Sequence, residues 1–180
     1  SPDASLVVFR ADQAVNERFE LYAVPIQGGT AVKVSGPLVA GRSVEPDFSI
    51  SSDSGHVVYR ADQGTDGVIE LYTSALAGAS VLRLSGSLTT GGNVTRFQIT
   101  ADGRGVVYRA DQEVDETHEL FGVSIEGGPS TKLSGVMTAD GDVGSAFQIS
   151  GDSRRVVYVA DQDTDNVLEL YSAPLWRGEA

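Results

Sequence analysis

The stretch VVFRADQ at residues 7–13 recurs as VVYRADQ at 57–63, VVYRADQ at 106–112 and VVYVADQ at 156–162. The aspartates of these copies, Asp12, Asp62, Asp111 and Asp161, are 50, 49 and 50 residues apart. A long block that returns in phase at a fixed period indicates a tandem array in which each copy folds as one supersecondary unit. We therefore divide the chain into repeats 1–50, 51–99, 100–149 and 150–180.

Further blocks accompany each copy. A Glu-Leu-Tyr or Glu-Leu-Phe block begins at Glu20, Glu70, Glu119 and Glu169, a Lys/Arg-Val/Leu-Ser-Gly block spans 33–36, 83–86 and 132–135, and a Phe-x-Ile block spans 48–51, 97–100 and 147–150. These blocks are short and apolar, and Gly, Asp, Ser and Asn separate them, which is typical of strands and turns. The second repeat is one residue shorter between Val94 and Phe97, and we place that difference in a loop.

Four short strands in each of several repeats of about 50 residues predict an all-β fold, a β-propeller of four-stranded blades. We expect one propeller domain over residues 1–180. The first repeat lacks the Phe-x-Ile strand and the fourth lacks the Lys-Leu-Ser-Gly strand, so the strands should number three, four, four and three. Unpaired strand edges promote aggregation. We therefore favour a piece of a larger propeller, or a homo-oligomer that completes the ring, over a closed ring of four blades.

Composition restricts the partners. The chain of 180 residues carries 25 acidic and 13 basic residues and a net charge of -12, which disfavours nucleic acid and favours cations or basic protein surfaces. It has no cysteine, hence no thiolate metal site, and it has no apolar run long enough for a membrane span. Because the chain opens at Ser1-Pro2-Asp3 without an initiator Met, we expect a processed or excised piece. Trp176 occurs once and is interpreted as an interface or edge residue.

Antiparallel strands place the tight turns of every repeat on one face and the long loops on the other. We expect Asp3, Asp53, Asp102 and Asp152 to be turn residues, and Phe9, Tyr59, Tyr108 and Tyr158 to pack between blades. Binding residues are found preferentially on long loops held by a rigid scaffold. A candidate site therefore belongs on the long-loop face.

The long loop after each VVYRADQ block carries Asp, then Asp or Asn, then Glu, four residues apart. The candidate calcium ligands are Asp62, Asp66 and Glu70; Asp111, Asp115 and Glu119; and Asp161, Asp163, Asp165 and Glu169. Asp12, Asn16 and Glu20 occupy the same positions in the first repeat. Oxygen ligands close together on a loop suit a hard cation such as Ca²⁺. The fourth repeat, with the most carboxylates, is the best metal candidate.

A structural role is the favoured alternative for these carboxylates. Asp and Asn bond backbone amides in turns, and each glutamate could pair with Arg10, Arg60 or Arg109 of the preceding block. Val159 replaces that arginine in the fourth repeat although Glu169 remains, so Glu169 needs a different partner.

We assign no catalytic residues. His56 and His118, the two histidines, fall in a tight turn and in a long loop, hence on opposite faces, and select no Ser-His-Asp set. The acidic residues recur once per repeat, whereas a catalytic site is asymmetric. Repetition favours structure or multivalent binding over an enzyme.

Three segments resemble the TolB-type, WD40-like β-propeller repeat: SSDSGHVVYRADQ (51–63) with ELYTSAL (70–76) and RLSG (83–86), ADGRGVVYRADQ (101–112), and GDSRRVVYVADQ (151–162). The resemblance implies a scaffold that binds other proteins, in the periplasm or outside the cell, and implies that such blades can adjoin hydrolase domains. Three functions follow: a non-catalytic module that binds a protein or other macromolecule through its long loops, a calcium-stabilised structural or adhesive propeller, and the propeller portion of a secreted hydrolase.

Overall fold

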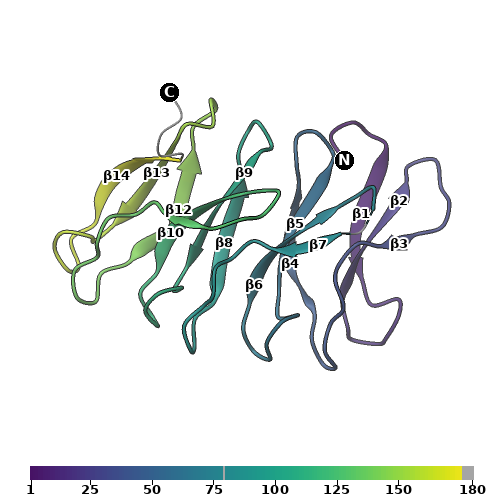
Figure 1. Ribbon diagram of the computed structural model, residues 1–180, viewed down its shortest axis with the longest axis horizontal. Coiled ribbons are helices and arrows are strands. Elements are labelled where there is room, and N and C mark those ends of the chain that lie inside the picture. The colour runs from purple at the N-terminus through teal and green to yellow at the C-terminus, as the bar shows by residue number, and fades with distance from the viewer. Residues whose placement is uncertain (79, 176–180) are drawn as a thin grey trace. The chain divides into compact units, whose positions relative to one another are not determined.

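A computed structural model describes residues 1–78 and 80–175, and Trp176 lies outside the described residues. The regular elements of the described chain are strands (Figure 1). Their bounds are β1 Leu6–Ala11, β2 Glu20–Pro25, β3 Val32–Lys33, β4 Val44–Ile50, β5 His56–Ala61, β6 Glu70–Ala75, β7 Val81–Arg83, β8 Val94–Ile99, β9 Gly105–Ala110, β10 Glu119–Ser124, β11 Thr131–Lys132, β12 Val143–Ile149, β13 Arg155–Ala160 and β14 Glu169–Pro174.

The strands form four antiparallel sheets in chain order, β1-β2-β3, β4-β5-β6-β7, β8-β9-β10-β11 and β12-β13-β14. The predicted strand numbers of three, four, four and three are confirmed. The strand pairs β1–β2, β5–β6, β9–β10 and β13–β14 share one register, and an aromatic pair marks it: Phe9–Tyr22, Tyr59–Tyr72, Tyr108–Phe121 and Tyr158–Tyr171 stack with ring centroids 5.4 to 5.8 Å apart. Tyr59 and Tyr108 are fully buried. Tyr59 and Tyr158 belong to the apolar clusters that join consecutive blades, which confirms the predicted packing between blades for these two residues, whereas Phe9 is half-buried.

The last strand of each of the first three sheets ends earlier than the sequence predicts. It stops at Lys33, Arg83 or Lys132, and the following Ser and Gly lie outside it. In the first sheet the N–H groups of Val34 and Ser35 both donate to the carbonyl oxygen of Leu21, at 2.8 and 3.3 Å, and the Ser35 hydroxyl accepts the N–H of Leu21. Two residues therefore oppose one, and the regular ladder ends.

The one-residue difference between repeats also lies elsewhere than predicted. It falls within the first strand of the sheet and not in a loop, because β4, β8 and β12 begin at Val44, Val94 and Val143. The pairing register shifts between Val44 and Phe48, between Val94 and Arg96, and between Val143 and Phe147. A bulge takes up an additional residue without disturbing the pairs on either side.

The chain divides into two compact units, Ser1–Leu84 and Ser85–Ala180. In the first, Leu21 and Val34 of the first sheet pack with Val57, Tyr59 and other buried residues of the second. In the second, Val107 and Leu120 pack in the same manner with Phe147 and Tyr158. Each unit thus contains one junction between consecutive blades. A single propeller over the whole chain stays a prediction.

The two ends of each blade differ as the antiparallel order predicts. At one end the tight turns meet, because the N–H groups of Asp3 and Asp102 donate to the hydroxyls of Ser54 and Ser153 in the next repeat. The turn role of Asp53 and its counterparts is confirmed by bonds such as Gly55 N–H to Asp53 Oδ1 at 2.9 Å. The long loops meet at the other end, where the N–H of Val44 donates to the carbonyl oxygen of Phe19.

Candidate functional site

Two kinds of loop form the long-loop end of each blade. We call residues 12–19, 62–69, 111–118 and 161–168 the acidic loops, and residues 34–43, 84–93 and 133–142 the connecting loops. Each acidic loop has a left-handed residue five positions after its first aspartate, namely Glu17, Gly67, Glu116 and Asn166, with φ between 60° and 73°. The shared backbone turn shows that the four loops adopt one conformation.

The first aspartate of the loop holds this turn. The N–H of the left-handed residue donates to Oδ2 of Asp12, Asp111 or Asp161, at 3.1 to 3.3 Å. Asp111 and Asp161 are almost completely buried, and their Oδ1 atoms each accept a second backbone N–H at 2.6 Å, from Asn93 and Asp142 of the connecting loop. The bond from Asp142 lowers the pKa of Asp161. These carboxylates therefore bind the two loops of a blade together.

Asp62 also joins an acidic loop to a connecting loop, but its partner is a side chain. Its Oδ2 lies 3.3 Å from Nη1 of Arg42, a residue of the connecting loop, and the same guanidinium pairs with Asp66. Two of the predicted calcium ligands of the second repeat thus share an arginine.

The glutamate that begins β2, β6 or β10 is buried and contacts a cation on the strand that follows it in the sheet. Glu20 pairs with Lys33 at 2.9 Å, Glu70 with Arg83 at 2.7 Å, and Glu119 with Lys132. Burial raises the pKa of Glu20, but the bonds from Lys33 and Tyr22 outweigh it, so the pKa is lowered. The cation is not the arginine that the sequence suggested. The basic residue 13 positions after each of these glutamates is the sequence feature that could have predicted the ion pair.

Arg10 and Arg109 bond to the next blade instead, whereas Arg60 pairs with Asp47 of β4 in its own sheet. Nε of Arg10 donates to the carbonyl oxygen of Val44 at 2.7 Å, and Nε of Arg109 donates to that of Val143 at 2.6 Å. In both cases the acceptor is the first residue of the following sheet. Arg10 and Arg109 are therefore links between consecutive blades.

A second link between blades was not anticipated from the sequence. The hydroxyl of Tyr59 accepts the N–H of Gly36 at 3.0 Å and lies 3.2 Å from Oε1 of Gln63. In the next unit, Gln162 Oε1 accepts the N–H of Gly135 at 2.9 Å and the hydroxyl of Tyr158 at 3.1 Å. The recurrence of Gln in the VVYRADQ block and of Gly after each Ser was the signal for this contact.

The fourth repeat adds Asp163 to the arrangement that the other repeats share. Asp163 Oδ2 and Glu169 Oε2 both accept the hydroxyl of Tyr171, at 3.0 and 2.9 Å, whereas Asp161 bonds the backbone amides and Asp165 is exposed. Desolvation and the two carboxylates raise the pKa of Tyr171. The partner that Glu169 required is thus a tyrosine of its own strand.

Over residues 1–78 and 80–175, no three His, Cys, Asp or Glu side chains form a group able to hold a metal ion. Asp115 is exposed on its loop, while Asp111 and Glu119 face amides and a lysine. Calcium binding by the acidic loops stays a prediction, and the contacts described above favour their structural role.

The two histidines lie at different ends of their own blades. His56 begins β5 beside a tight turn, whereas His118 ends an acidic loop. The backbone N–H of His118 donates to Oδ1 of Asp142 at 2.6 Å, and its Nδ1 lies 3.2 Å from the same oxygen. This contact fastens an acidic loop to a connecting loop.

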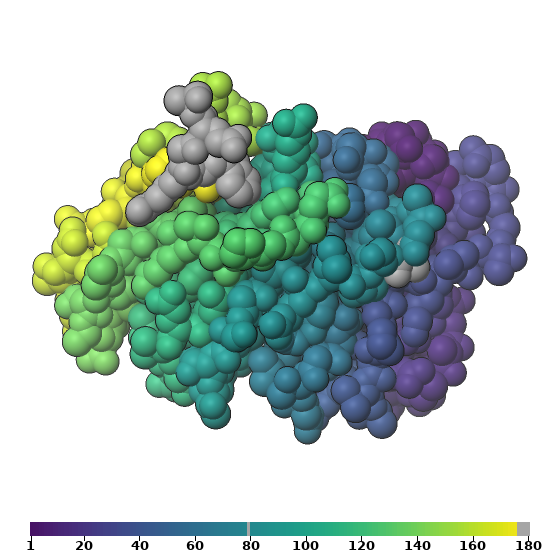
Figure 2. All heavy atoms as spheres, viewed as in Figure 1, coloured from purple at the N-terminus to yellow at the C-terminus, as the bar shows by residue number. Residues whose placement is uncertain are grey.

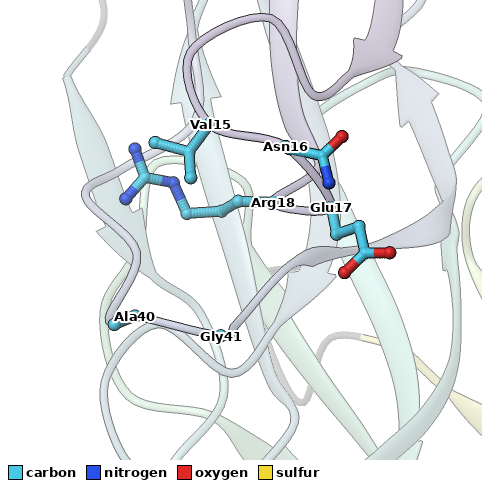
Figure 3. A pocket seen from close by; sticks show the side chains of 6 residues that line it. All are labelled: Val15, Asn16, Glu17, Arg18, Ala40 and Gly41. Atoms are coloured by element: carbon cyan, nitrogen blue, oxygen red, sulfur yellow. The ribbon is translucent and has the colours of Figure 1, made fainter.

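A small cavity opens at the loop end of the first repeat. It has a volume of about 300 Å³ and is lined by Val15, Asn16, Glu17, Arg18, Ala40 and Gly41 (Figure 3). The acidic loop supplies four of these residues and the connecting loop supplies two. Asn16, Glu17 and Arg18 supply the polar groups of its lining.

The comparisons with known proteins identify the fold. No family model and no curated protein matches the chain. Among solved structures, TolB of Agrobacterium tumefaciens superposes with a TM-score of 0.61 at 17% identity, over 98% of this chain and 62% of that one. TolB of Acinetobacter baumannii superposes with a TM-score of 0.59 at 16% identity, over 99% of this chain and 40% of that one. An oligogalacturonate lyase in complex with manganese superposes with a TM-score of 0.61 at 17% identity, over 97% of this chain and 46% of that one.

These similarities, together with the four antiparallel sheets, define the class: the chain has a β-propeller fold. The fold is similar to that of the two TolB structures, as the sequence predicted. The chain spans 62% and 40% of the lengths of the two TolB structures. The part of the chain that the structure describes contains no helix long and apolar enough to cross a membrane.

Proposed function

We propose that the chain is a non-catalytic β-propeller module that binds a protein or another macromolecule through the exposed acidic residues of its acidic loops. The observation that carries this proposal is that the loop carboxylates form a buried set and an exposed set. The buried ones, Asp111, Asp161 and Glu119 among them, hold the loops in one conformation. The others, including Asp115 and Asp165, are exposed on that rigid frame.

The chemistry of these loops favours a cationic partner. Exposed carboxylates on a preorganised backbone attract a basic surface and lose little conformational entropy on binding. The net charge of -12 opposes binding to a phosphate backbone. We therefore expect a partner with a lysine- or arginine-rich surface and do not expect nucleic acid. Since the blades resemble TolB, we also expect the periplasm or the extracellular space.

A charge-neutralising pair of substitutions tests this function. The double variant Asp115→Asn, Asp165→Asn changes two exposed acidic-loop residues, and Glu126→Gln removes a charge at the opposite end of the third blade. Proteins captured from an extract of the source cells by the unmodified chain are identified, and the main partner is purified and titrated. We expect the double variant to bind several-fold more weakly and Glu126→Gln to bind normally. Equal affinity for all three chains contradicts the proposal.

The propeller portion of a larger hydrolase is the second candidate. It is supported by structural similarity to enzymes. This chain covers 17% of the tricorn protease and superposes on it with a TM-score of 0.65. It covers 30% of a puromycin-hydrolysing peptidase from Mycobacterium tuberculosis, with a TM-score of 0.59. In this case the reaction belongs to another domain. The sequence that adjoins this chain in its gene decides between the two candidates.

A further inference from the structure

The first acidic loop contains an arginine that its counterparts lack. Arg18 lines the cavity of about 300 Å³ between this loop and the connecting loop that follows it (Figure 3). Figure 2 shows both loops at the surface at the lower right, purple for residues 12–19 and blue-violet for residues 34–43. In the other repeats the same position holds an uncharged residue, Val68, Thr117 or Val167. The cavity of the first repeat therefore has a positively charged wall.

The positive charge of Arg18 is not required by the carboxylate beside it. Its Nε lies 3.9 Å from Oε1 of Glu20 and is buried without a hydrogen-bond partner among the described residues. Glu20 already accepts the ammonium group of Lys33 at 2.9 Å and the hydroxyl of Tyr22 at 3.0 Å. A buried donor without an acceptor is costly, and a ligand that supplies the acceptor removes that cost.

Two other charged side chains near the cavity are directed elsewhere. Arg42, which follows Gly41 in the connecting loop, pairs with Asp62 of the second blade at 3.3 Å. In Figure 3 the carboxylate of Glu17 points away from the guanidinium of Arg18. Arg18 therefore supplies the positive charge of this cavity.

Hydrogen bonds between the two loops hold the walls of the cavity in place. The hydroxyl of Ser43 accepts the N–H of Phe19 at 3.0 Å and donates to the carbonyl oxygen of Glu17 at 3.4 Å. The left-handed turn at Glu17 is fixed by Asp12, whose Oδ2 accepts its N–H at 3.2 Å. A site formed before the ligand arrives loses little conformational entropy on binding.

The lining of the cavity selects the chemistry of a ligand. A guanidinium matches a planar carboxylate through two parallel N–H···O bonds. Val15 and Ala40 offer apolar contact to a short aliphatic stem, and Asn16 adds a neutral amide. The net charge of -12 opposes a doubly charged phosphate more strongly than a singly charged carboxylate. A volume of about 300 Å³ lies at the lower end for ligand sites, which favours a small molecule or group.

We propose that this cavity binds a small monocarboxylate, with the carboxylate on the guanidinium of Arg18 and the apolar stem against Val15 and Ala40. A free short-chain acid and the C-terminal carboxylate of a peptide offer the same chemistry, and the test separates them. The site is distinct from the one proposed for a basic partner, because it uses an arginine and a cavity and not the exposed carboxylates of the third and fourth acidic loops.

A titration of the 180-residue chain with sodium butyrate, followed by NMR of the arginine Nε–H groups, tests the site. The signal of Arg18 is identified by its loss in Arg18→Gln. We expect butyrate to shift this signal to saturation, and butyramide, which has the same shape without the charge, to leave it in place. Chemical shifts of backbone amides in the two loops report binding to the variants.

Arg18→Gln should bind butyrate about tenfold more weakly or worse, because charge-assisted hydrogen bonds are lost. Arg104→Gln is the matched control, since it removes an exposed arginine from a tight turn at the opposite end of the third blade, and it should bind normally. Ala40→Leu keeps the arginine but fills the cavity, and should weaken binding several-fold with unchanged circular dichroism.

N-acetylalanine, a model of a peptide terminus, identifies the source of the carboxylate. Tighter binding of N-acetylalanine than of butyrate assigns the site to a peptide terminus, and the reverse order or equal affinity assigns it to a free acid. The proposal is overturned by the absence of saturation with both acids, or by an equal shift with butyramide or with sodium chloride. Tighter binding of inorganic phosphate, or unchanged affinity in Arg18→Gln or in Ala40→Leu, overturns it as well.

Discussion

The backbone N–H of Gly36, at the end of the first sheet, donates to the buried hydroxyl of Tyr59 in the second sheet, at 3.0 Å. Burial raises the pKa of this tyrosine to about 12, so it remains a neutral phenol at physiological pH. Gly36 also has little room for a side chain, because a Cβ there would lie 2.6 Å from Nε2 of Gln63. The contact joins two blades through one hydroxyl.

Tyr59→Phe should destabilise the fold by about 1 to 2 kcal/mol, because the N–H of Gly36 loses its acceptor in a buried place. Phe9→Tyr is the matched control in the opposite direction. It adds a hydroxyl to the half-buried ring of Phe9, at the position that Tyr59 occupies one repeat later, and we expect a change within about 0.5 kcal/mol. Urea unfolding measures both. A loss of similar size in the two variants would show that the Gly36 bond is not the cause.

Phe121→Tyr should stabilise the third blade. Glu20, Glu70 and Glu169 each accept a tyrosine hydroxyl from their own strand, from Tyr22, Tyr72 and Tyr171. Phe121 stands at this position beside Glu119, whose Oε2 has no hydrogen-bond partner among the described residues. A hydroxyl there should contribute about 1 kcal/mol.

The reverse change, Tyr72→Phe, should cost a similar amount in the second blade. Thermal and urea unfolding of the two variants give the comparison. An unchanged or lower midpoint for Phe121→Tyr would mean that the buried site cannot admit the hydroxyl.

Acid should weaken the fold in a defined range. Hydrogen bonds from Ser51 and Thr100 lower the pKa of Asp53 and Asp102, and the amide of Asp142 lowers that of Asp161. A carboxylate with a lowered pKa in the folded state stabilises the fold above its unfolded pKa of about 3.9, and this contribution disappears as the pH falls through the folded value.

The unfolding midpoint should therefore be level from neutral pH to about pH 5 and fall below about pH 4. Asp102→Asn should have a lower midpoint at pH 7 and a shallower acid decline than the unmodified chain. Parallel acid profiles for the two chains would show that Asp102 does not contribute.

Calcium should leave the unfolding temperature unchanged. Asp111 and Asp161 accept backbone N–H groups with both oxygens, and Glu119 contacts Lys132, so the loops need no ion to hold them. Heating the chain with Ca²⁺ and with EDTA measures this directly. A site occupied at 100 times its Kd would add about 2.7 kcal/mol, an easily measured shift. Such a shift would establish the alternative calcium-stabilised function, and Asp163→Asn and Asp165→Asn would then locate the site.

The sequence alone determined the repeat, the all-β class and the strand count, because a blade is a local unit whose strands follow one another in the chain. The periodic VVYRADQ and Glu-Leu-Tyr blocks register directly against each other in the structure, with Phe9 opposite Tyr22 and Tyr59 opposite Tyr72. The turn role of the aspartates could also be predicted from the sequence, since Asp53 bonds Gly55 only two residues away.

Tertiary structure decided the partners of the other charged side chains, because those partners come from distant positions. Asp111 meets the amide of Asn93, and Arg10 meets the carbonyl oxygen of Val44 34 residues later. A run of carboxylates has the same sequence whether it surrounds an ion or accepts backbone N–H groups. The difference depends on where the connecting loop lies, and that is determined by the packing of one blade on the next.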